Sequence, residues 1–382
     1  MKQANSVTSR WLCAIIGLLL FSPLNLAAGD SHAQNFLVFV GTLGSSLRGI
    51  YAYRFNAATG AATFLGLAVE TPNPSFIAVS PDQHTLYAVN EIPDGNVSAF
   101  RIGPEGKLAL IDFVPSGGAN PCDLALDRKG TVLLVANCSG GSVALLPIRK
   151  DGGLAEPTAV VQHHGSGVDP VRQKGPYAHG VAITPDGDFA AVADYGLDKI
   201  FVHPLDVQRQ TLREGDSFAG VVLGGAVRHI AFTPNGKFLY AIDEFDSALT
   251  VFRYSHGALR KLETLSALLP AATVKRGGSE ITVDPSGRYL YVSIRGEENK
   301  IAVFAIDRLT GHPSPIQFIS SGGIMPRHFA LSPDGSWLAV ANQNSHSIVW
   351  MRRDAQSGKL ASNAQQSEQV NSPTCVVFVN AR

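Results

Sequence analysis

The sequence predicts an all-β protein, a seven-bladed β-propeller built from four-stranded antiparallel sheets. Three observations support this fold: short runs of alternating apolar residues, turns rich in Pro, Asn, Asp and Gly, and repetition of the whole unit along the chain. The clearest copy is VRHIAFTPNGKFLYAIDEFDSALTVFRY at 227–254, where a Pro-Asn-Gly turn separates the first two of three strands. Proline presets φ at the first central position of such a turn, and Asn-Gly tolerates the conformation that follows.

The spacing of this turn sets the number of blades. Successive turns lie 47 to 57 residues apart, which is the length of one four-stranded unit. A seventh start, SPTCVVFVN at 372–380, reaches the end of the chain, and its continuation stands at the beginning, in 36–42 and 49–55. We therefore expect the N- and C-terminal strands to pair in one blade and close the ring. The turn positions are Pro81, Arg128, Pro185, Pro234, Pro285 and Pro333.

Composition agrees with one large globular domain, which we expect to cover residues 34–382. The chain has 382 residues, of which 45% are hydrophobic and 16% charged, so it can bury a large core. Its formal net charge is zero, which gives no global electrostatic reason to expect nucleic acid or an anionic membrane as a partner. We expect a monomer that acts on a small molecule.

The first 33 residues have the layout of a secretory signal peptide. Lys2 and Arg10 precede an apolar run at 11–21, and small residues follow it, with cleavage expected after Ala28 or Ala33. The apolar run is short for a membrane span, although an uncleaved anchor is the alternative. We expect a periplasmic or secreted protein with no membrane attachment after the leader is cleaved.

Export would permit disulfides among the mature cysteines. Cys122 begins one predicted strand and Cys138 ends its antiparallel partner, so a bridge between them is feasible. Cys375 is expected to be a buried apolar residue.

Candidate functional residues come from the propeller geometry itself. The start of each first strand and the end of each second strand reach the same mouth of the central channel, and His, Arg and Glu side chains fall at these positions. Charged groups that converge at one mouth indicate a binding or catalytic site. The first ring is Ser75, Cys122, His179, Arg228, Ser279, Arg327 and Thr374; the next residues along are Phe76, Asp123, Gly180, His229, Glu280, His328 and Cys375. The ring at the ends of the second strands is Thr42, Glu91, Cys138, Tyr195, Glu244, Arg295 and Gln343.

The longest turn spacing reflects an insertion, QHHGSGVDPVRQKGPYAHG at 162–180. It precedes a first strand, so we expect it at the same mouth, where inserted loops often carry function. His163 and His164 have no third ligand at metal spacing, and a solvated loop is the expectation for both. The sequence has no Ser-centred elbow, phosphate-binding glycine loop or CxxC pair.

Five long motifs resemble the seven-bladed propeller lactonases, the group of bacterial 6-phosphogluconolactonase and fungal carboxy-muconate cyclase. The resemblance covers almost all of residues 35–382. The motifs are NPSFIAVSPDQHTLYAVNE, GSGVDPVRQKGPYAHGVAITPDG, VRHIAFTPNGKFLYAIDE, SEITVDPSGRYLYVSIRG and PRHFALSPDG.

The resemblance implies four site residues, namely His179, Arg228, Glu244 and Arg327. His229 completes an Arg-His pair that the family also has. The sequence departs from the family at three places. Tyr177 stands where the family often has His, Ala226-Val227 where it has Gly-Pro, and Ile294-Arg295 where it has Asn-Arg.

Ring opening of a lactone needs an activated water, a stabilised oxyanion and a protonated leaving alkoxide. We assign Glu244 as base, His179 as acid, and Arg228 with Arg327 as clamps for an anionic group, with the acid and base roles open to exchange. The residues expected to contact substrate around them are Glu91, Arg295, Tyr177, Tyr195 and Glu280.

Other interpretations of these residues stay open. Arg228 and Arg327 could be structural ion-pair partners, and His229 and His328 alternate away from the first ring, as supporting histidines would. Turn capping explains the polar residues that recur near strand ends, Asn90, Asn137, Asp194, Asp243 and Asn342. A calcium site from Glu91, Asn137 and Asp194 is the alternative to a metal-independent, cofactor-free site.

The sequence thus predicts an exported lactonase that acts on a sugar or related lactone. Export argues against 6-phosphogluconolactone as natural substrate, because sugar phosphates are made in the cytoplasm. The alternatives are a cycloisomerase of the carboxymuconate type and a non-catalytic binding propeller.

Overall fold

The computed structural model describes Met1 and residues 35–44, 49–269, 277–362 and 365–381. The chain divides into two compact units, 1–32 and 33–382, and apart from Met1 only the second is described. The expected signal peptide, with its cleavage positions, lies outside the described residues. Within these ranges, no helix is long and apolar enough to cross a membrane.

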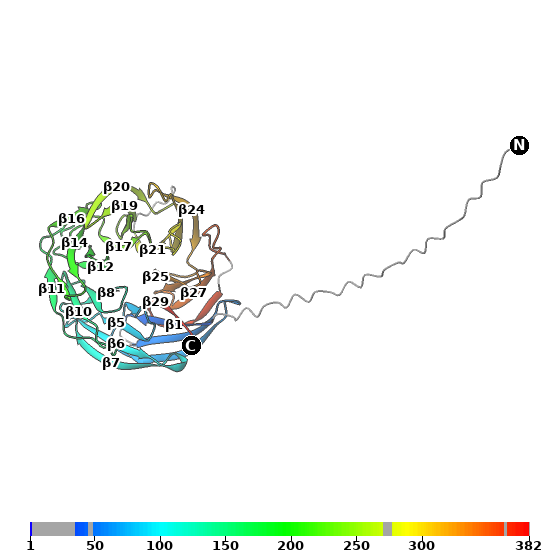
Figure 1. Cartoon of the computed structure of the whole chain (residues 1–382), viewed down its shortest axis with the longest axis horizontal. Helices are drawn as coiled ribbons and strands as arrows, with labels where there is room; N and C mark the ends of the chain where they lie inside the picture. The colour runs from blue at the N-terminus through cyan, green and yellow to red at the C-terminus, as the bar shows by residue number, and fades with distance from the viewer. Residues whose placement is uncertain (2–34, 45–48, 270–276, 363–364, 382) are drawn as a thin grey trace. The chain divides into compact units, whose positions relative to one another are not determined.

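Seven antiparallel sheets form a ring in the second unit, as predicted, and the first strand of each sheet faces the centre (Figure 1). Blade 1 contains β29 (Pro373–Asn380), β1 (Asn35–Thr42), β2 (Gly49–Asn56) and β3 (Ala62–Glu70). Blade 2 contains β4 (Ile77–Val79), β5 (Thr85–Asn90), β6 (Asn96–Ile102) and β7 (Leu108–Pro115), with the 3-10 turn η1 (Pro104–Gly106). Blade 3 contains β8 (Pro121–Leu126), β9 (Val132–Asn137), β10 (Ser142–Pro147) and β11 (Ala159–Gln162).

The remaining blades follow the same order from the centre outward. Blade 4 contains β12 (Ala178–Ile183), β13 (Phe189–Asp194) and β14 (Lys199–Asp206), and its outer strand is split into β15 (Thr211–Leu212) and β16 (Ser217–Gly220). Blade 5 contains β17 (Val227–Phe232), β18 (Phe238–Asp243), β19 (Ala248–Ser255) and β20 (Ala258–Ser266). Blade 6 contains β21 (Gly278–Val283), β22 (Tyr289–Ile294), β23 (Lys300–Ile306) and β24 (Pro313–Ser320). Blade 7 contains β25 (Pro326–Leu331), β26 (Trp337–Asn342), β27 (Ser347–Arg352) and β28 (Gln365–Gln369).

Blade 1 closes the ring as the split repeat predicts. β29, from the C-terminus, pairs with β1 in a register that sets Phe36 opposite Asn380 and Val40 opposite Val376. This pairing supplies the innermost strand of the blade and satisfies an edge of β1 that would otherwise be open.

The turn between the first and second strands of a blade is stabilised by its own side chains and by a glycine with positive φ. In blade 5 the Asn235 side chain accepts a hydrogen bond from the Lys237 amide at 3.1 Å and contacts the Thr233 hydroxyl at 2.8 Å. Gly236 has φ of +69°, which a residue with a side chain rarely adopts. The turn therefore needs both its Asn and its Gly.

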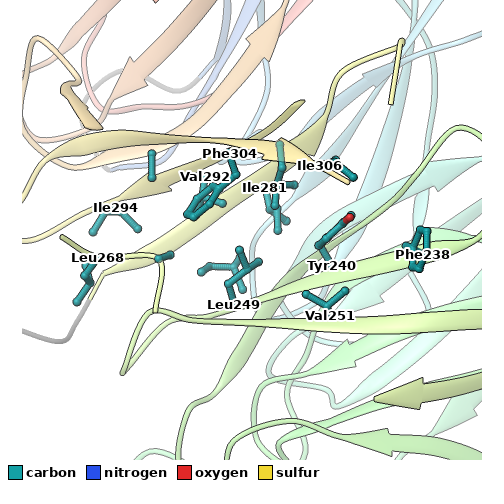
Figure 2. Close-up of a cluster of buried hydrophobic side chains, with 14 residues drawn as sticks. Phe238, Tyr240, Leu249, Val251, Leu268, Ile281, Val292, Ile294, Phe304 and Ile306 are labelled. Carbon is teal, nitrogen blue, oxygen red and sulfur yellow. The ribbon is translucent and has the colours of Figure 1, made fainter. Parts of the chain in front are cut away.

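Apolar side chains of adjacent blades pack into continuous clusters between the sheets. Figure 2 shows one between blades 5 and 6, where Tyr240 and Leu249 face Ile281 and Val292, all at most 3% exposed. Burial of such large side chains contributes about 1.5–3 kcal/mol each. Because the cluster draws on both sheets, each blade depends on its neighbour.

Hydroxyl groups of second-strand tyrosines add a polar link between blades. Tyr87, Tyr240 and Tyr291 each donate to a glycine carbonyl in the next blade, at 2.9, 2.7 and 2.6 Å. One acceptor, Gly311, leaves no room for a side chain, since a Cβ there would lie 2.4 Å from the Phe238 ring. These hydrogen bonds join adjacent sheets in addition to the apolar packing between them.

Candidate active site

Bulges in the central strands turn the first-ring side chains out of the alternating pattern. The pairing register of β8, β12, β17, β25 and β29 skips one residue each. The skipped residues are Cys122, His179, Arg228, Arg327 and Thr374. A bulge bends the strand and re-aims its extra side chain, so the ring found by sequence alignment corresponds to a repeated backbone irregularity.

The ring at the ends of the second strands is tied to the same place by backbone hydrogen bonds. Six of its seven residues, all but Thr42, directly follow their strand, and their N–H groups donate to a carbonyl shortly before the central strand. Glu244 donates to Ala226 at 2.9 Å and Arg295 to Gly277 at 2.7 Å. Ala226 has φ of +60°, a left-handed conformation that costs a residue with a Cβ about 1 kcal/mol.

Glu244 is surrounded by guanidinium groups. One carboxylate oxygen lies 2.6 Å from Arg295 and 3.5 Å from Arg228, and the other lies 3.2 Å from Arg172. Burial alone would raise the pKa of Glu244, but Arg295 and Arg228 outweigh it and the pKa is lowered. Burial, and then the positive charges of Arg295 and Arg327, lower the pKa of Arg228 to about 10, which leaves it charged at neutral pH. Glu244 is therefore a firmly ionised carboxylate.

Arg172 is a site residue that the sequence analysis missed. It lies in the insertion, donates to the Tyr195 hydroxyl at 2.7 Å, and stacks 3.8 Å above the Phe245 ring. Gln173, which is fully buried, donates to the Tyr195 carbonyl and to Asp198, and holds the loop in place. The insertion does reach the predicted mouth. The sequence placed the insertion at the mouth, but it gave no reason to choose Arg172 among the polar residues of that loop.

Arg327 lies on the other side of the same mouth. Its guanidinium is 3.9 Å from Glu91 and donates to the Gln343 side chain at 3.4 Å. We call Arg172, Arg228, Arg295, Arg327, Glu91 and Glu244 the mouth cluster. Its four positive and two negative groups leave two positive charges in excess (4 − 2), which suits an anionic ligand.

His179 stands beside the mouth cluster as a neutral imidazole. Its ring is 6.1 Å from the Tyr195 ring and 5.3 Å from the His229 ring. Burial, and then the positive charges of Arg228 and Arg327, hold the pKa of His179 well below its usual range. Within the described part of the chain its buried Nδ1 atom has no hydrogen-bond partner.

A buried polar layer supports the mouth cluster from below. Glu280 accepts from His229 Nδ1 at 2.9 Å and lies 3.5 Å from His328, while Arg228 contacts His229 Nε2 at 3.3 Å. Burial raises the pKa of Glu280, but its two histidines outweigh this and bring it to about 2. The structure thus places Glu280 in this supporting layer, between His229 and His328.

Tyr177 lies at the rim of the mouth. Its ring meets Tyr195 edge-on at 6.4 Å, and it lines a cavity of about 450 Å³ formed with the insertion. Of the expected substrate contacts, Arg295 and Glu91 belong to the mouth cluster, and the Tyr195 hydroxyl contacts two of its members, Arg172 and Glu244. Tyr177 borders it.

Cys122 and Cys138 are free thiols, so the feasible disulfide is not formed in this structure. Cys122 occupies the bulge, and Cys138 lies one residue beyond the paired part of β9, so the two are not opposite in register. Burial, followed by the Cys138 thiol, raises the pKa of Cys122 well above its usual value. Cys375 is fully buried, as expected.

The expectation of a solvated loop is wrong for His163. This residue is 4% exposed and its Nδ1 lies 2.6 Å from Asp194, while Nε2 lies 3.0 Å from His203 Nε2. His163 packs against Asp194 and His203 of blade 4, whereas the next residue, His164, is exposed. Asp194 also accepts from the Tyr177 and Gly196 amides, so the proposed calcium ligand is already bonded within the protein.

Comparison with known proteins identifies the family. The sequence profile described as "Lactonase, 7-bladed beta-propeller" matches residues 37–378. The chain belongs to this lactonase family. The resemblance seen in the sequence is confirmed, and with it the expectation of a lactone hydrolase at the level of the family.

This lactonase is similar to proteins with related names. A 6-phosphogluconolactonase of Bacillus subtilis (strain 168) is 29% identical over 351 residues, which cover 90% of this chain and 99% of the relative. A 6-phosphogluconolactonase of Formosa agariphila is 32% identical over 326 residues, covering 83% and 92%. The solved Pseudomonas aeruginosa periplasmic gluconolactonase, PpgL, is 35% identical with a TM-score of 0.85, covering 91% and 100%.

Proposed function

We propose that this lactonase hydrolyses an anionic sugar lactone at the mouth cluster, in an exported form of the protein. The observation that carries the proposal is the excess of guanidinium groups around Glu244, beside the neutral imidazole of His179. Guanidinium groups bind carboxylate or phosphate in two-point geometry and stabilise an oxyanion as it forms. Membership of the lactonase family supports the reaction class.

The electrostatics favour exchange of the acid and base roles assigned from the sequence. The Glu244 oxygens are engaged by three arginines that lower its pKa, so this carboxylate is a poor base. The pKa of His179 is lowered too, so its imidazole is unprotonated at neutral pH and can accept a proton but has none ready to donate. Neutral His179 would take the proton of the attacking water and return it to the leaving alkoxide. Glu244 would hold Arg228 and Arg295 in place.

A negatively charged substrate would raise the pKa of His179. An anionic group bound by the arginines offsets their field, which is one of the causes that lower the pKa of His179. The imidazole therefore becomes more basic when the anionic lactone is bound. This coupling favours lactones with a carboxylate or phosphate over uncharged ones.

The leader and a relative's cellular location support export. Lys2, Arg10 and the apolar run have signal-peptide layout, and the similar Pseudomonas aeruginosa protein is described as periplasmic. In that compartment a carboxylated sugar lactone is a more available substrate than a phosphorylated one. The proposed catalyst is a monomer that needs no metal ion.

Lactone turnover measured in a pH-stat tests the proposal. We expect acid release from gluconolactone, from its 6-phosphate and from a uronic acid lactone, with higher kcat/KM for the anionic compounds. His179→Gln and Glu244→Gln should each lower kcat/KM by about 100-fold or more, because each removes a positioned charge or base. Glu156→Gln, an exposed carboxylate on an outer loop, is the matched control.

The product separates the alternatives. Hydrolysis in ¹⁸O-labelled water places one solvent oxygen in the product acid, whereas a cycloisomerase incorporates none. Binding of lactones without turnover, at unchanged melting temperature, would support a non-catalytic propeller and overturn the proposal.

A further inference from the structure

Two thiols and an imidazole converge beside the mouth cluster. Cys122 from β8, Cys138 after β9 and His179 from β12 each offer a ligand atom, and these atoms all lie within 4.8 Å of one another. They come from two blades that pack directly against each other. The Cys122 thiol, for example, contacts the His179 carbonyl at 3.4 Å.

The ligand atoms have few competing partners. The described residues supply no hydrogen-bond partner for the buried Nδ1 atom of His179. The Cys122 thiol makes weak contacts with the carbonyls of Ala178 and His179, at 3.8 and 3.4 Å. An unsatisfied buried nitrogen next to two thiols is costly unless something binds there.

The donor set fits a zinc ion. Two cysteines and one histidine are a known catalytic-type zinc ligand set, in which a fourth position stays open. Zinc bond lengths place tetrahedral ligand atoms about 3.5–3.8 Å apart, so ligand atoms that lie within 4.8 Å of one another need to approach by at most about 1.3 Å. Cys138 and His179 are only partly buried, which gives the ion a path from the mouth.

The charges around the three ligand residues favour a divalent ion that binds thiolates over one that prefers oxygen ligands. Arg228, Arg295 and Arg327 lie close enough to act on His179, and they oppose the binding of a bare cation. Two thiolates cancel the charge of a divalent ion, so the occupied site is neutral. Calcium and magnesium prefer oxygen ligands and gain little from thiolates.

We propose that Cys122, Cys138 and His179 bind one zinc ion, with its fourth position facing the channel mouth. Zinc at this site lowers the basicity of the imidazole, whichever ring nitrogen it occupies. As a consequence, which rests on the proposed function, zinc suppresses lactone turnover. The site would then act as a zinc-sensitive inhibitory site of this lactonase.

Cobalt substitution tests the binding site directly. Reduced, chelator-treated protein titrated with Co²⁺ should show thiolate-to-cobalt absorption that saturates at one equivalent and is removed by Zn²⁺. Cys138→Ser should lose at least about half of that absorption, because one of two thiolate ligands is gone. The control Cys375→Ser alters a buried thiol of β29 and should keep the full signal.

Three results would overturn the site: no thiolate band in the wild type, a full band in a Cys122→Ser/Cys138→Ser double variant, or a Cys122–Cys138 disulfide in protein isolated without reductant. If the variants fail to fold, the presence or absence of the thiolate band in the wild-type protein decides the question by itself.

The inhibitory role has its own readout. One equivalent of zinc should lower kcat at least tenfold in the wild type and in Cys375→Ser, and have little effect on the remaining activity of Cys138→Ser. Full lactone turnover by the zinc-loaded protein would contradict the inhibitory role. The binding site itself would still stand if the cobalt spectrum shows the thiolate band. A protein that turns over no lactone, yet shows the band, contradicts only the proposed function.

Discussion

Two buried histidines of this propeller, His203 and His328, are held neutral by their surroundings. Burial lowers the pKa of His328 to about 4, and burial together with His163 lowers that of His203 to about 4. The hydrogen bonds agree with neutral rings: His203 Nδ1 accepts from the Gly215 amide, and His328 Nδ1 accepts from the Val376 amide. Protonation of either ring would remove an acceptor from a buried amide.

These histidines make stability depend on pH. The unfolded chain takes up a proton near pH 6.5 and the folded His203 only near pH 4, so stability falls as pH drops from 6.5 to 4. A shift of this size corresponds to about 3 kcal/mol per histidine. His203→Gln should reduce this loss by about that amount, measured as unfolding free energy in urea at pH 7, 5.5 and 4.5.

The exposed His164 next to the buried cluster provides the control for this prediction. His164→Gln should follow the wild-type pH dependence. An equal pH dependence in His203→Gln and the wild type would contradict the neutral buried state.

At the scale of elements, the buried side chain of Gln173 anchors the insertion between blades 3 and 4. Gln173 donates to Asp198 and to the Tyr195 carbonyl and accepts from the Asp169 amide at 3.1 Å, all inside the protein. Asp198 in turn accepts from the Ala226 amide, before the strand that carries Arg228. The loop and the adjoining central strand are therefore parts of one hydrogen-bond network.

Removal of Gln173 should loosen the loop and release Arg172 from Glu244. We expect Gln173→Ala to raise KM for an anionic lactone by about tenfold, since a charge-assisted bond contributes about 1.5–3 kcal/mol. Faster hydrogen exchange of residues 165–175 should accompany it. Lys174→Ala, the exposed next residue, should change neither quantity, and an unchanged KM in Gln173→Ala would show that Arg172 has no part in binding.

At the scale of the molecule, the closing blade decides whether the ring is complete. The C-terminal strand β29 buries Cys375, Val376 and Val379, which belong to the apolar clusters on both sides of blade 1. Its loss would expose both clusters and the edge of β1.

Deletion of residues 373–382 should therefore prevent stable folding at 25 °C. Three buried side chains contribute at least about 5 kcal/mol, which is comparable to the whole stability of a typical domain. Deletion of 381–382 alone should leave cooperative unfolding intact, as followed by circular dichroism on heating. A cooperative transition at the wild-type temperature in the longer deletion would show that closure is dispensable.

Much of this architecture could be predicted from the chain alone. A turn that begins with Pro in five of six repeats and has Gly at its third position in five of six recurs at blade length. It carries its own conformational requirement, as at Gly236, so local chemistry determined the blade number and the closure. Alignment on that turn also placed His179, Arg228 and Glu244 at one mouth. The same alignment gave no sign that bulges, rather than strand alternation, direct these side chains.

The sequence by itself determined the repeat, the split blade and the family, because these depend on patterns local to each unit. Only the tertiary structure decided which partners meet: Arg172 with Glu244, Glu280 with two histidines, His163 with Asp194, and two thiols with His179. These contacts join residues from different blades or loops, and their geometry follows from how the sheets pack around the channel. Protonation follows from that packing as well, since burial and neighbouring charges set it, and neither can be read from residue identity.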